Sequence, residues 1–195
     1  MLQGKLRING LISAFMLFLI SLIICVYYTY STIRSDVINT LDNRLINAAT
    51  SVKYILGDDY HSKINKTQTI SFATYESKSK QLSELAQALD IAYVYSMVLI
   101  NGKVHFSASS YTQEDQNSGK VTQFLDLYPE ATKANIGAFL STEPVFEISS
   151  DQWGDFKTIF IPHIDKNGIT YLTAADISLK TINNKLAQSA STSAV

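Results

Sequence analysis

The stretch "DQWGDFKTIFIPHIDKNGITYLTAADISL", residues 151–179, decides the fold. β-branched and aromatic residues dominate its two halves, and these predict one strand at Phe156–Ile164 and another at Ile169–Leu179. The residues between the two strands, Asp165–Gly168, are of the types that form tight turns. The stretch is therefore expected to fold as a β-hairpin, with Asp176 as the only acid of its second strand.

Asp176 follows two alanines in a strand that is otherwise largely apolar. Because side chains alternate between the two faces of a strand, Asp176 shares its face with Leu172 and Ala174. One interpretation is a cross-strand ion pair or a solvated acid. The other is a pocket acid, for which the small alanines leave room above the sheet.

The length of the turn sets the residue that lies opposite Asp176. If all four residues Asp165–Gly168 form the connection, Lys157 lies directly across from Asp176. If only Asn167-Gly168 turns, Ile159 takes that place and Lys157 is a diagonal neighbour. Both registers bring Lys157 close to the acid.

Three further strands are predicted upstream, at Ile91–Ile100, Lys103–Ser109 and Pro144–Ile148. Asn101-Gly102 separates the first two, and this dipeptide is a strong signal for a two-residue hairpin turn. Helical segments are expected at Tyr75–Asp90, Gln123–Tyr128 and Glu130–Phe139, and Ser110–Lys120 reads as a polar excursion. The order of elements predicts an α+β fold with a five-stranded antiparallel sheet.

Residues 8–30, "INGLISAFMLFLISLIICVYYTY", contain no charged side chain. At about 1.5 Å per residue they form a helix of about 35 Å, enough to cross a hydrocarbon layer of about 30 Å. Lys5 and Arg7 flank one end and tyrosines flank the other, which predicts a cytoplasmic N-terminus. The expected parts are a cytoplasmic segment at 1–7, a transmembrane helix at 8–30, an exported domain at 31–186 and a tail at 187–195.

Other interpretations of the apolar segment fit less well. A cleaved signal peptide has a shorter apolar core and a small-residue cleavage site. A lipoprotein signal would use Cys25, but Ile24 stands where a small residue is expected. A type IV pilin would carry a glutamate in this segment, which contains no acid. The sequence therefore favours an uncleaved single-pass anchor in the cytoplasmic membrane.

The helix continues past the membrane segment without proline or glycine as far as Gly57. Apolar residues recur there at steps of three and four, which places them on one stripe. We expect a long helix continuous with the anchor. The stripe at Ile33, Val37, Leu41 and Leu45 predicts a homodimer through this first helix.

Composition and motifs exclude several classes of function. The chain has 195 residues and a formal net charge of −1, which indicates no nucleic-acid partner. Cys25 is the only cysteine, and the three histidines are scattered, so neither a disulfide nor a metal site is expected. No nucleophile motif, phosphate loop or dinucleotide fingerprint occurs, so we predict a protein that is not an enzyme and has no cofactor.

The closing strand carries the pattern G-x-x-Y-x-x-x-A-D-I-S at residues 168–178. Together with residues 153–156, "WGDF", and 160–162, "FIP", it resembles the Cache (PDC, PAS-like) extracytoplasmic sensor domains. These occur in bacterial chemoreceptors, sensor kinases and diguanylate cyclases. The resemblance covers roughly residues 33–186 and implies the N-terminal part of a receptor whose second membrane span and output domain would follow.

The resemblance also implies a ligand site. Amino-acid-binding members of the family hold the ligand carboxylate with an arginine, whereas this sequence has none after Arg44. Asp176 matches the family's acid, which can meet a ligand ammonium. An amine-bearing or neutral ligand is thus favoured over a plain carboxylate, although capture of a carboxylate by a lysine or by backbone amides stays open. The expected ligand-binding residues are Asp176, Trp153, Tyr128, Tyr95 and Lys157.

The leading hypothesis is a membrane-anchored receptor of chemoreceptor type, which binds a small molecule in the periplasm or outside the cell and signals through its first helix. The alternative is a structural or assembly protein of the cell envelope that uses the same sheet for protein contacts. A polar-lined cavity near Asp176 would favour the receptor, and a fully packed interior would favour the alternative.

Overall fold

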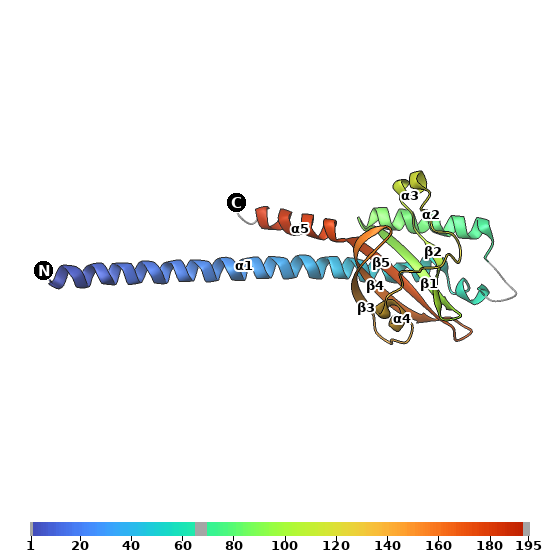
Figure 1. The fold of residues 1–195 in the computed structure, drawn as a ribbon, viewed down its shortest axis with the longest axis horizontal. Coiled ribbons are helices and arrows are strands. Elements are labelled where there is room, and N and C mark those ends of the chain that lie inside the picture. Colours follow the sequence, from blue (N-terminus) through green and yellow to red (C-terminus); the bar gives the residue numbers. More distant parts are fainter. Residues whose placement is uncertain (1, 65–69, 193–195) are drawn as a thin grey trace. The chain divides into compact units, whose positions relative to one another are not determined.

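The structure is a computed structural model that describes residues 2–64 and 70–192. The chain divides into two compact units. One is Leu41–Ile182, which holds the sheet, and the other comprises residues before Leu41 and after Ile182. The ribbon and the element labels are shown in Figure 1.

The first helix, α1 (Leu2–Leu56), is continuous, as the absence of helix breakers predicted. Within the described residues it is the one helix long and apolar enough to cross a membrane. Most of its large apolar side chains between Leu11 and Tyr30 are exposed. Exposed apolar side chains over this length are typical of a helix whose solvent is lipid.

The sheet has five antiparallel strands in the order β2-β1-β5-β4-β3, which confirms the predicted α+β class. The strands are β1 (Tyr93–Ile100), β2 (Lys103–Ser109), β3 (Val145–Asp151), β4 (Gly154–Ile164) and β5 (Thr170–Ser178). The turn between β1 and β2 is Asn101-Gly102, as predicted, and both residues have positive φ. The closing strand β5 lies at the centre of the sheet.

The register of β4 and β5 differs from both predicted registers. Residues 165–169 connect the strands, and Thr158 lies directly opposite Asp176, where Lys157 or Ile159 was expected. A shift of one residue moves a side chain to the other face of the sheet. Lys157 is therefore on the face opposite Asp176, and the predicted cross-strand ion pair between them is wrong.

The helices after α1 differ in part from the predicted ones. They are α2 (Phe72–Ala88), α3 (Gln113–Ser118), α4 (Lys133–Ala138) and α5 (Leu179–Thr192), with a 3-10 turn, η1 (His61–Lys63). The prediction of a helix at Gln123–Tyr128 is wrong, because this segment forms a turn and a bridge to β2. The helix α3 formed instead within the polar excursion, and the helix α5 was not predicted.

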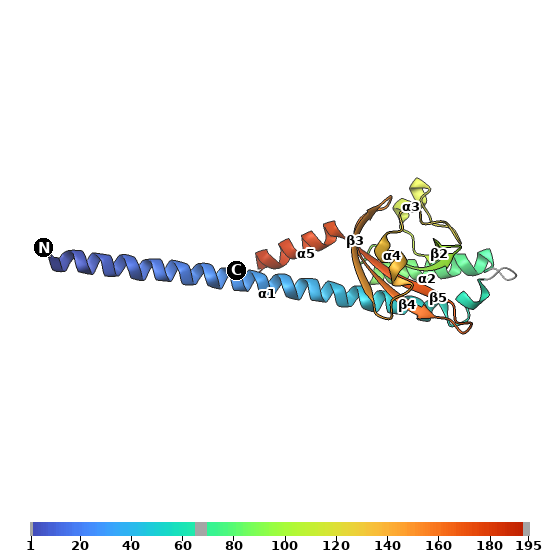
Figure 2. The same ribbon diagram turned by 60° about the horizontal axis from the view of Figure 1, so that its bottom comes forward.

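One face of the sheet is covered by α2 and by the last turns of α1, and α4 lies on the other (Figures 1 and 2). The face that α2 and the last turns of α1 cover buries Val94, Ile159 and Ile177 completely. The opposite face carries a core cluster that includes Met97, Phe106, Phe160 and Leu172. Asp176 belongs to this second face, next to Ala174 and Leu172, as the strand alternation predicted.

The stripe predicted for dimerisation is partly used within the protein itself. Leu41 is 3% exposed and Leu45 is fully buried in the unit Leu41–Ile182. These two residues are therefore not available to a second copy, which corrects that part of the prediction. Ile33 and Val37 remain, and the homodimer stays a prediction.

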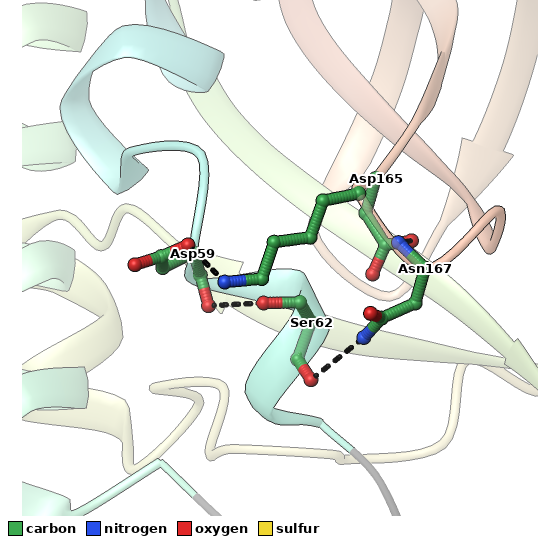
Figure 3. Close-up of polar contacts among 5 residues, drawn as sticks. Asp59, Ser62, Asp165 and Asn167 are labelled. Atoms are coloured by element: carbon green, nitrogen blue, oxygen red, sulfur yellow. Dashed lines mark hydrogen bonds and ion pairs between the residues drawn. The ribbon is translucent and has the colours of Figure 1, made fainter.

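The segment after α1 is fastened to the turn between β4 and β5 (Figure 3). The Lys166 ammonium pairs with Asp59 Oδ1 at 2.5 Å, and Asn167 Nδ2 donates to the Ser62 carbonyl at 3.3 Å. Asp165 Oδ1 accepts two backbone N–H bonds of the turn at 2.8 Å, one of them from Asn167. These contacts hold η1 against the sheet.

Two histidines lie beside the ring of Tyr171, on the face of the sheet that α1 and α2 cover. His61 is 4% exposed and stacks on Tyr171, with ring centroids 3.6 Å apart. Its Nε2 atom lies 3.3 Å from Ser96 Oγ and 3.2 Å from Ser107 Oγ. The ring of His163 lies 5.2 Å from that of Tyr171. The hydrogen-bond partners of His61 Nε2 are thus the hydroxyl groups of two serines.

Candidate ligand-binding site

A hollow opens over β1, β2 and β5 on the face of the sheet that carries Asp176. Its cavity volume is only about 20 Å³. Such an inner volume holds about one water molecule. The hollow is therefore a narrow pocket with a wider mouth, and its walls combine aromatic rings with three carboxylates.

Asp176 lies at the base of this pocket and is 5% exposed. Its Oδ1 atom accepts a hydrogen bond from Thr158 Oγ1 at 2.7 Å and another from Tyr95 OH at 3.0 Å. Thr158 reaches it because the two residues are cross-strand partners, and Tyr95 reaches it from the neighbouring strand β1. The structure shows no donor to Oδ2 among the described residues, so this oxygen is available to a ligand.

Burial shifts the acid-base equilibria of this site. Loss of solvation raises the pKa of Asp176 to about 7, although the hydrogen bonds from Thr158 and Tyr95 oppose the shift. Burial, and next the charge of Asp176, raise the pKa of Tyr95 well above its usual value, so Tyr95 stays a hydrogen-bond donor. Within the described residues no lysine or arginine contacts Asp176, and a cationic ligand would stabilise its ionised form.

A second acid, Asp115, faces the pocket from α3 and is 4% exposed. Its Oδ2 atom accepts hydrogen bonds from Thr112 N and Thr112 Oγ1, both at 2.7 Å, which completes a capping box at the start of α3. Its Oδ1 atom accepts a hydrogen bond from Tyr93 OH at 3.2 Å. The cap therefore holds the wall of the pocket in place.

The third acid, Asp151, organises the turn between β3 and β4. Its Oδ1 atom accepts bonds from the N–H groups of Trp153 at 2.9 Å and Gly154 at 3.3 Å, and its Oδ2 atom accepts one from Tyr128 OH at 3.1 Å. Gly154 has a φ of +146°, and a Cβ there would lie 3.2 Å from the ring of Phe156. Glycine at this position therefore permits the turn that places Trp153 at the pocket.

Lys120 lies at the mouth of the pocket. Its Nζ atom donates to the Gln152 carbonyl at 2.9 Å, and its own carbonyl accepts a bond from Trp153 Nε1 at 3.3 Å. These two hydrogen bonds join the segment after α3 to the turn between β3 and β4. Lys120 is the one basic side chain among the described residues that line the pocket.

The structure brings four of the five predicted site residues together. Asp176, Trp153, Tyr128 and Tyr95 all line the same pocket. Lys157 lies apart from them on the other face, where its Nζ atom contacts Asp42 Oδ1 at 2.5 Å. Its assignment to the site is corrected for the same reason as the ion pair, namely the register of β4 and β5.

Several residues of the pocket were not predicted from the sequence. Asp115, Asp151 and Tyr93 were not among the predicted site residues. The pattern Thr112-x-x-Asp115 was a recognisable capping-box signal for Asp115. Asp151 carried no such signal, because its role at the pocket depends on a hydrogen bond from Tyr128, which belongs to another segment of the chain.

No cluster of metal-ligating side chains accompanies the pocket. Among residues 2–64 and 70–192, no group of three or more His, Cys, Asp and Glu side chains has the geometry to hold a metal ion. The three pocket carboxylates belong to β5, α3 and the end of β3, and hydrogen bonds from tyrosine or threonine engage each of them.

A search against protein-family models gives no match, and a search by sequence against curated proteins gives none either. Solved structures do match. The sensory domain of the Campylobacter jejuni chemoreceptor Tlp3 with isoleucine bound is 14% identical, with a TM-score of 0.55 over 81% of this chain and 60% of that chain. The ligand-binding domain of the same receptor in complex with L-valine is 15% identical, with the same TM-score and coverage.

An extracellular ligand binding receptor from Desulfohalobium retbaense is 9% identical, with a TM-score of 0.51 over 83% of this chain and 26% of that chain. This chain thus spans about 60% of the length of the Tlp3 domains. At such low identities the likeness concerns the fold, and it agrees with the resemblance to Cache domains in the closing strand. The chain has the fold of the extracytoplasmic sensory domains of bacterial receptors.

Proposed function

We propose that this protein is a membrane-anchored sensor that binds a small amine in the Asp176 pocket outside the cytoplasm. The observation that carries the proposal is a buried carboxylate with one free oxygen, Asp176 Oδ2, in a pocket that opens to the surface. A buried charge is costly unless it is paired. A ligand ammonium would supply the missing partner and donate a charge-assisted hydrogen bond.

The charges of the pocket favour an amine without a carboxylate of its own. Asp176, Asp115 and Asp151 all line the pocket, and Lys120 is the one cation beside them. Arg44 lies elsewhere, where its Nη1 atom donates to the Leu89 carbonyl at 3.3 Å. The Tlp3 structures hold isoleucine or valine, but in this chain the pocket offers no arginine for an amino-acid carboxylate.

The alternative, an envelope assembly protein, predicted a fully packed interior. The pocket beside Asp176 is narrow, yet three carboxylates stand among its aromatic walls and it opens to the surface, which supports ligand binding. Connecting loops line part of the pocket, and such loops are common locations for ligand sites. The sensor hypothesis therefore accounts for the pocket, and the assembly hypothesis does not.

Signal transfer through α1 completes the proposal. We propose that residues 8–30 anchor the chain in the cytoplasmic membrane, that residues 31–186 form the exported sensor, and that a chemoreceptor-type output follows. The Lys157–Asp42 pair connects β4, a neighbour of the ligand strand, to α1. A ligand that favours one packing of β4 and β5 would thereby bias α1.

A thermal-shift screen tests the proposal. The full chain in lipid nanodiscs is exposed to amines, amino acids, organic acids and nucleobases, and a ligand that binds the native state raises the melting temperature. We expect a hit among the amines, and its loss in Asp176→Asn. Asp176→Asn keeps the shape of the side chain and should weaken a cationic ligand by about 1.5–3 kcal/mol. A hit that binds Asp176→Asn as tightly as the wild type would place the site elsewhere.

A further inference from the structure

A second hollow adjoins the Asp176 pocket and is far roomier. It offers about 250 Å³ for the centre of a water molecule, against about 20 Å³ in the pocket. Four residues line both spaces: Phe106, Lys120, Thr122 and Trp153. They form the wall between an inner pocket and this outer hollow.

The indole of Trp153 forms part of this wall. Its indole Nε1 donates one hydrogen bond, to the Lys120 carbonyl at 3.3 Å, and this distance is at the weak end of the range. The edge of its ring contacts Phe106, with centroids 5.9 Å apart. Asp151 holds the backbone of the turn separately, through Trp153 N and Gly154 N. Rotation of the indole would cost this long hydrogen bond and its packing against the core cluster, and it would leave the hydrogen bonds of the turn in place.

The size of the inner pocket limits what reaches Asp176. A primary ammonium group has a single heavy atom, like a water molecule, so it matches the size of the inner pocket. Its N–H groups can donate to Asp176 Oδ2. A trimethylammonium head has three methyl groups instead of hydrogens and no N–H donor. It needs a larger space and cannot hydrogen-bond the carboxylate.

We propose that Trp153 is a movable wall between the two spaces, and that the ligand is an elongated primary amine that occupies both. Its ammonium lies in the inner pocket beside Asp176, and its chain passes Trp153 into the outer hollow. The proposal deepens the sensor function and rests on it. It assigns the outer hollow as a second subsite and Trp153 as the residue that selects primary over quaternary amines.

The end of the ligand in the outer hollow is not a second cation. The Lys120 ammonium lies at that hollow, bonded to the Gln152 carbonyl at 2.9 Å, and would repel another ammonium. Asp126 also lines the hollow, but its Oδ2 atom accepts the backbone N–H of Gln123 at 2.6 Å. A monoamine with a neutral far end fits this arrangement.

Two matched probes test the proposal on the full chain in nanodiscs: butylamine and butyltrimethylammonium. Wild-type protein is expected to bind butylamine at least tenfold more tightly than butyltrimethylammonium. In Trp153→Ala, which joins the two spaces, the ratio should fall at least threefold, because the larger head gains room while the N–H bonds to Asp176 still favour butylamine. Leu140→Ala is the control, because Leu140 lines neither space and is 89% exposed, and it should keep the wild-type ratio.

Tryptophan fluorescence gives a readout without mutation, because Trp153 is the only tryptophan of the chain. Saturating butylamine should shift the emission and change its quenching by acrylamide. Trp153→Phe keeps an aromatic ring and serves if Trp153→Ala fails to fold. The inference is overturned if emission and quenching stay unchanged at saturation, or if wild type binds both probes equally.

The outcomes separate the two proposals. Equal binding of both probes, abolished in Asp176→Asn, leaves the amine sensor intact and removes the role of Trp153. Binding of neither probe, in the wild type or in Trp153→Ala, overturns the amine sensor and this inference together. A tenfold preference that persists in Trp153→Ala assigns the selection to another part of the wall and overturns the inference alone.

Discussion

Thr158 lies directly opposite Asp176 on the neighbouring strand, and its hydroxyl donates to Asp176 Oδ1 at 2.7 Å. The sequence predicted Lys157 or Ile159 in the place that Thr158 occupies. A hydroxyl stabilises the carboxylate without neutralising it, so the charge of Asp176 stays available to a ligand. A lysine in that place would have formed an ion pair with Asp176 and neutralised its charge.

Replacement of Thr158 by valine should destabilise the protein and favour the neutral form of Asp176. The change keeps the shape of the side chain but removes one of the two donors to a buried acceptor, which costs about 1–3 kcal/mol. Denaturant unfolding at pH 8 measures the loss, and a carboxyl-carbon NMR titration follows Asp176. Thr158→Ser keeps the hydroxyl and is the control, and a Thr158→Val variant as stable as Thr158→Ser would contradict the prediction.

Asp176→Asn should stabilise the protein in the absence of ligand, and the gain should grow as pH rises from about 4 to about 7. The pKa of Asp176 rises from 3.8 unfolded to about 7 folded, so the folded state binds more protons between these values and stability falls as pH rises through them. The cost is complete above pH 7 and amounts to roughly 4 kcal/mol as an upper bound. Melting curves should show the variant above the wild type at pH 8 and equal to it near pH 4.

His61 should act in the opposite direction. Burial, together with the charge of His163, lowers the pKa of His61 from 6.5 to about 3, so the unfolded state binds the extra proton below pH 6.5. Stability is then lost as pH falls through 6.5 and below, by about 2 kcal/mol at pH 5. His61→Gln should show a flatter stability profile between pH 7 and pH 5, and parallel profiles for variant and wild type would refute this.

Lys157→Met should reduce stability and leave amine binding unchanged. The pair with Asp42 is partly buried, with side-chain exposures of 16% and 25%, and its loss should cost about 1–3 kcal/mol. Because Lys157 lies on the sheet face opposite Asp176, the pocket keeps its lining. Urea unfolding and a binding titration separate the two effects, and a variant with weakened amine binding at full stability would return Lys157 to the site.

The membrane topology is predicted from the flanking charges and can be tested with reporters. Alkaline phosphatase fused after Leu186 should be active, because Lys5 and Arg7 keep the N-terminus in the cytoplasm. A cytoplasmic reporter at the same place is the control and should be inactive. The reverse pattern of activities would invert the assignment.

The sequence by itself determined the features that depend on local pattern. Alternation along β5 put Asp176 on one face with Leu172 and Ala174, Asn101-Gly102 predicted the first hairpin, and an uncharged run predicted the apolar part of α1. Each of these follows from residues a few positions apart, where side-chain period and turn chemistry act. The closing strand also carried enough of the pattern for the sensor fold.

Only the tertiary structure decided which residues form the site. The register of β4 and β5 depends on a five-residue connection, in which Asp165 binds the backbone of the turn, and one residue of difference exchanged Lys157 for Thr158. The Lys157–Asp42 contact joins residues more than a hundred positions apart. Trp153 likewise gains its role from the segment that holds Lys120, and such long-range contacts leave no periodic signal in the sequence.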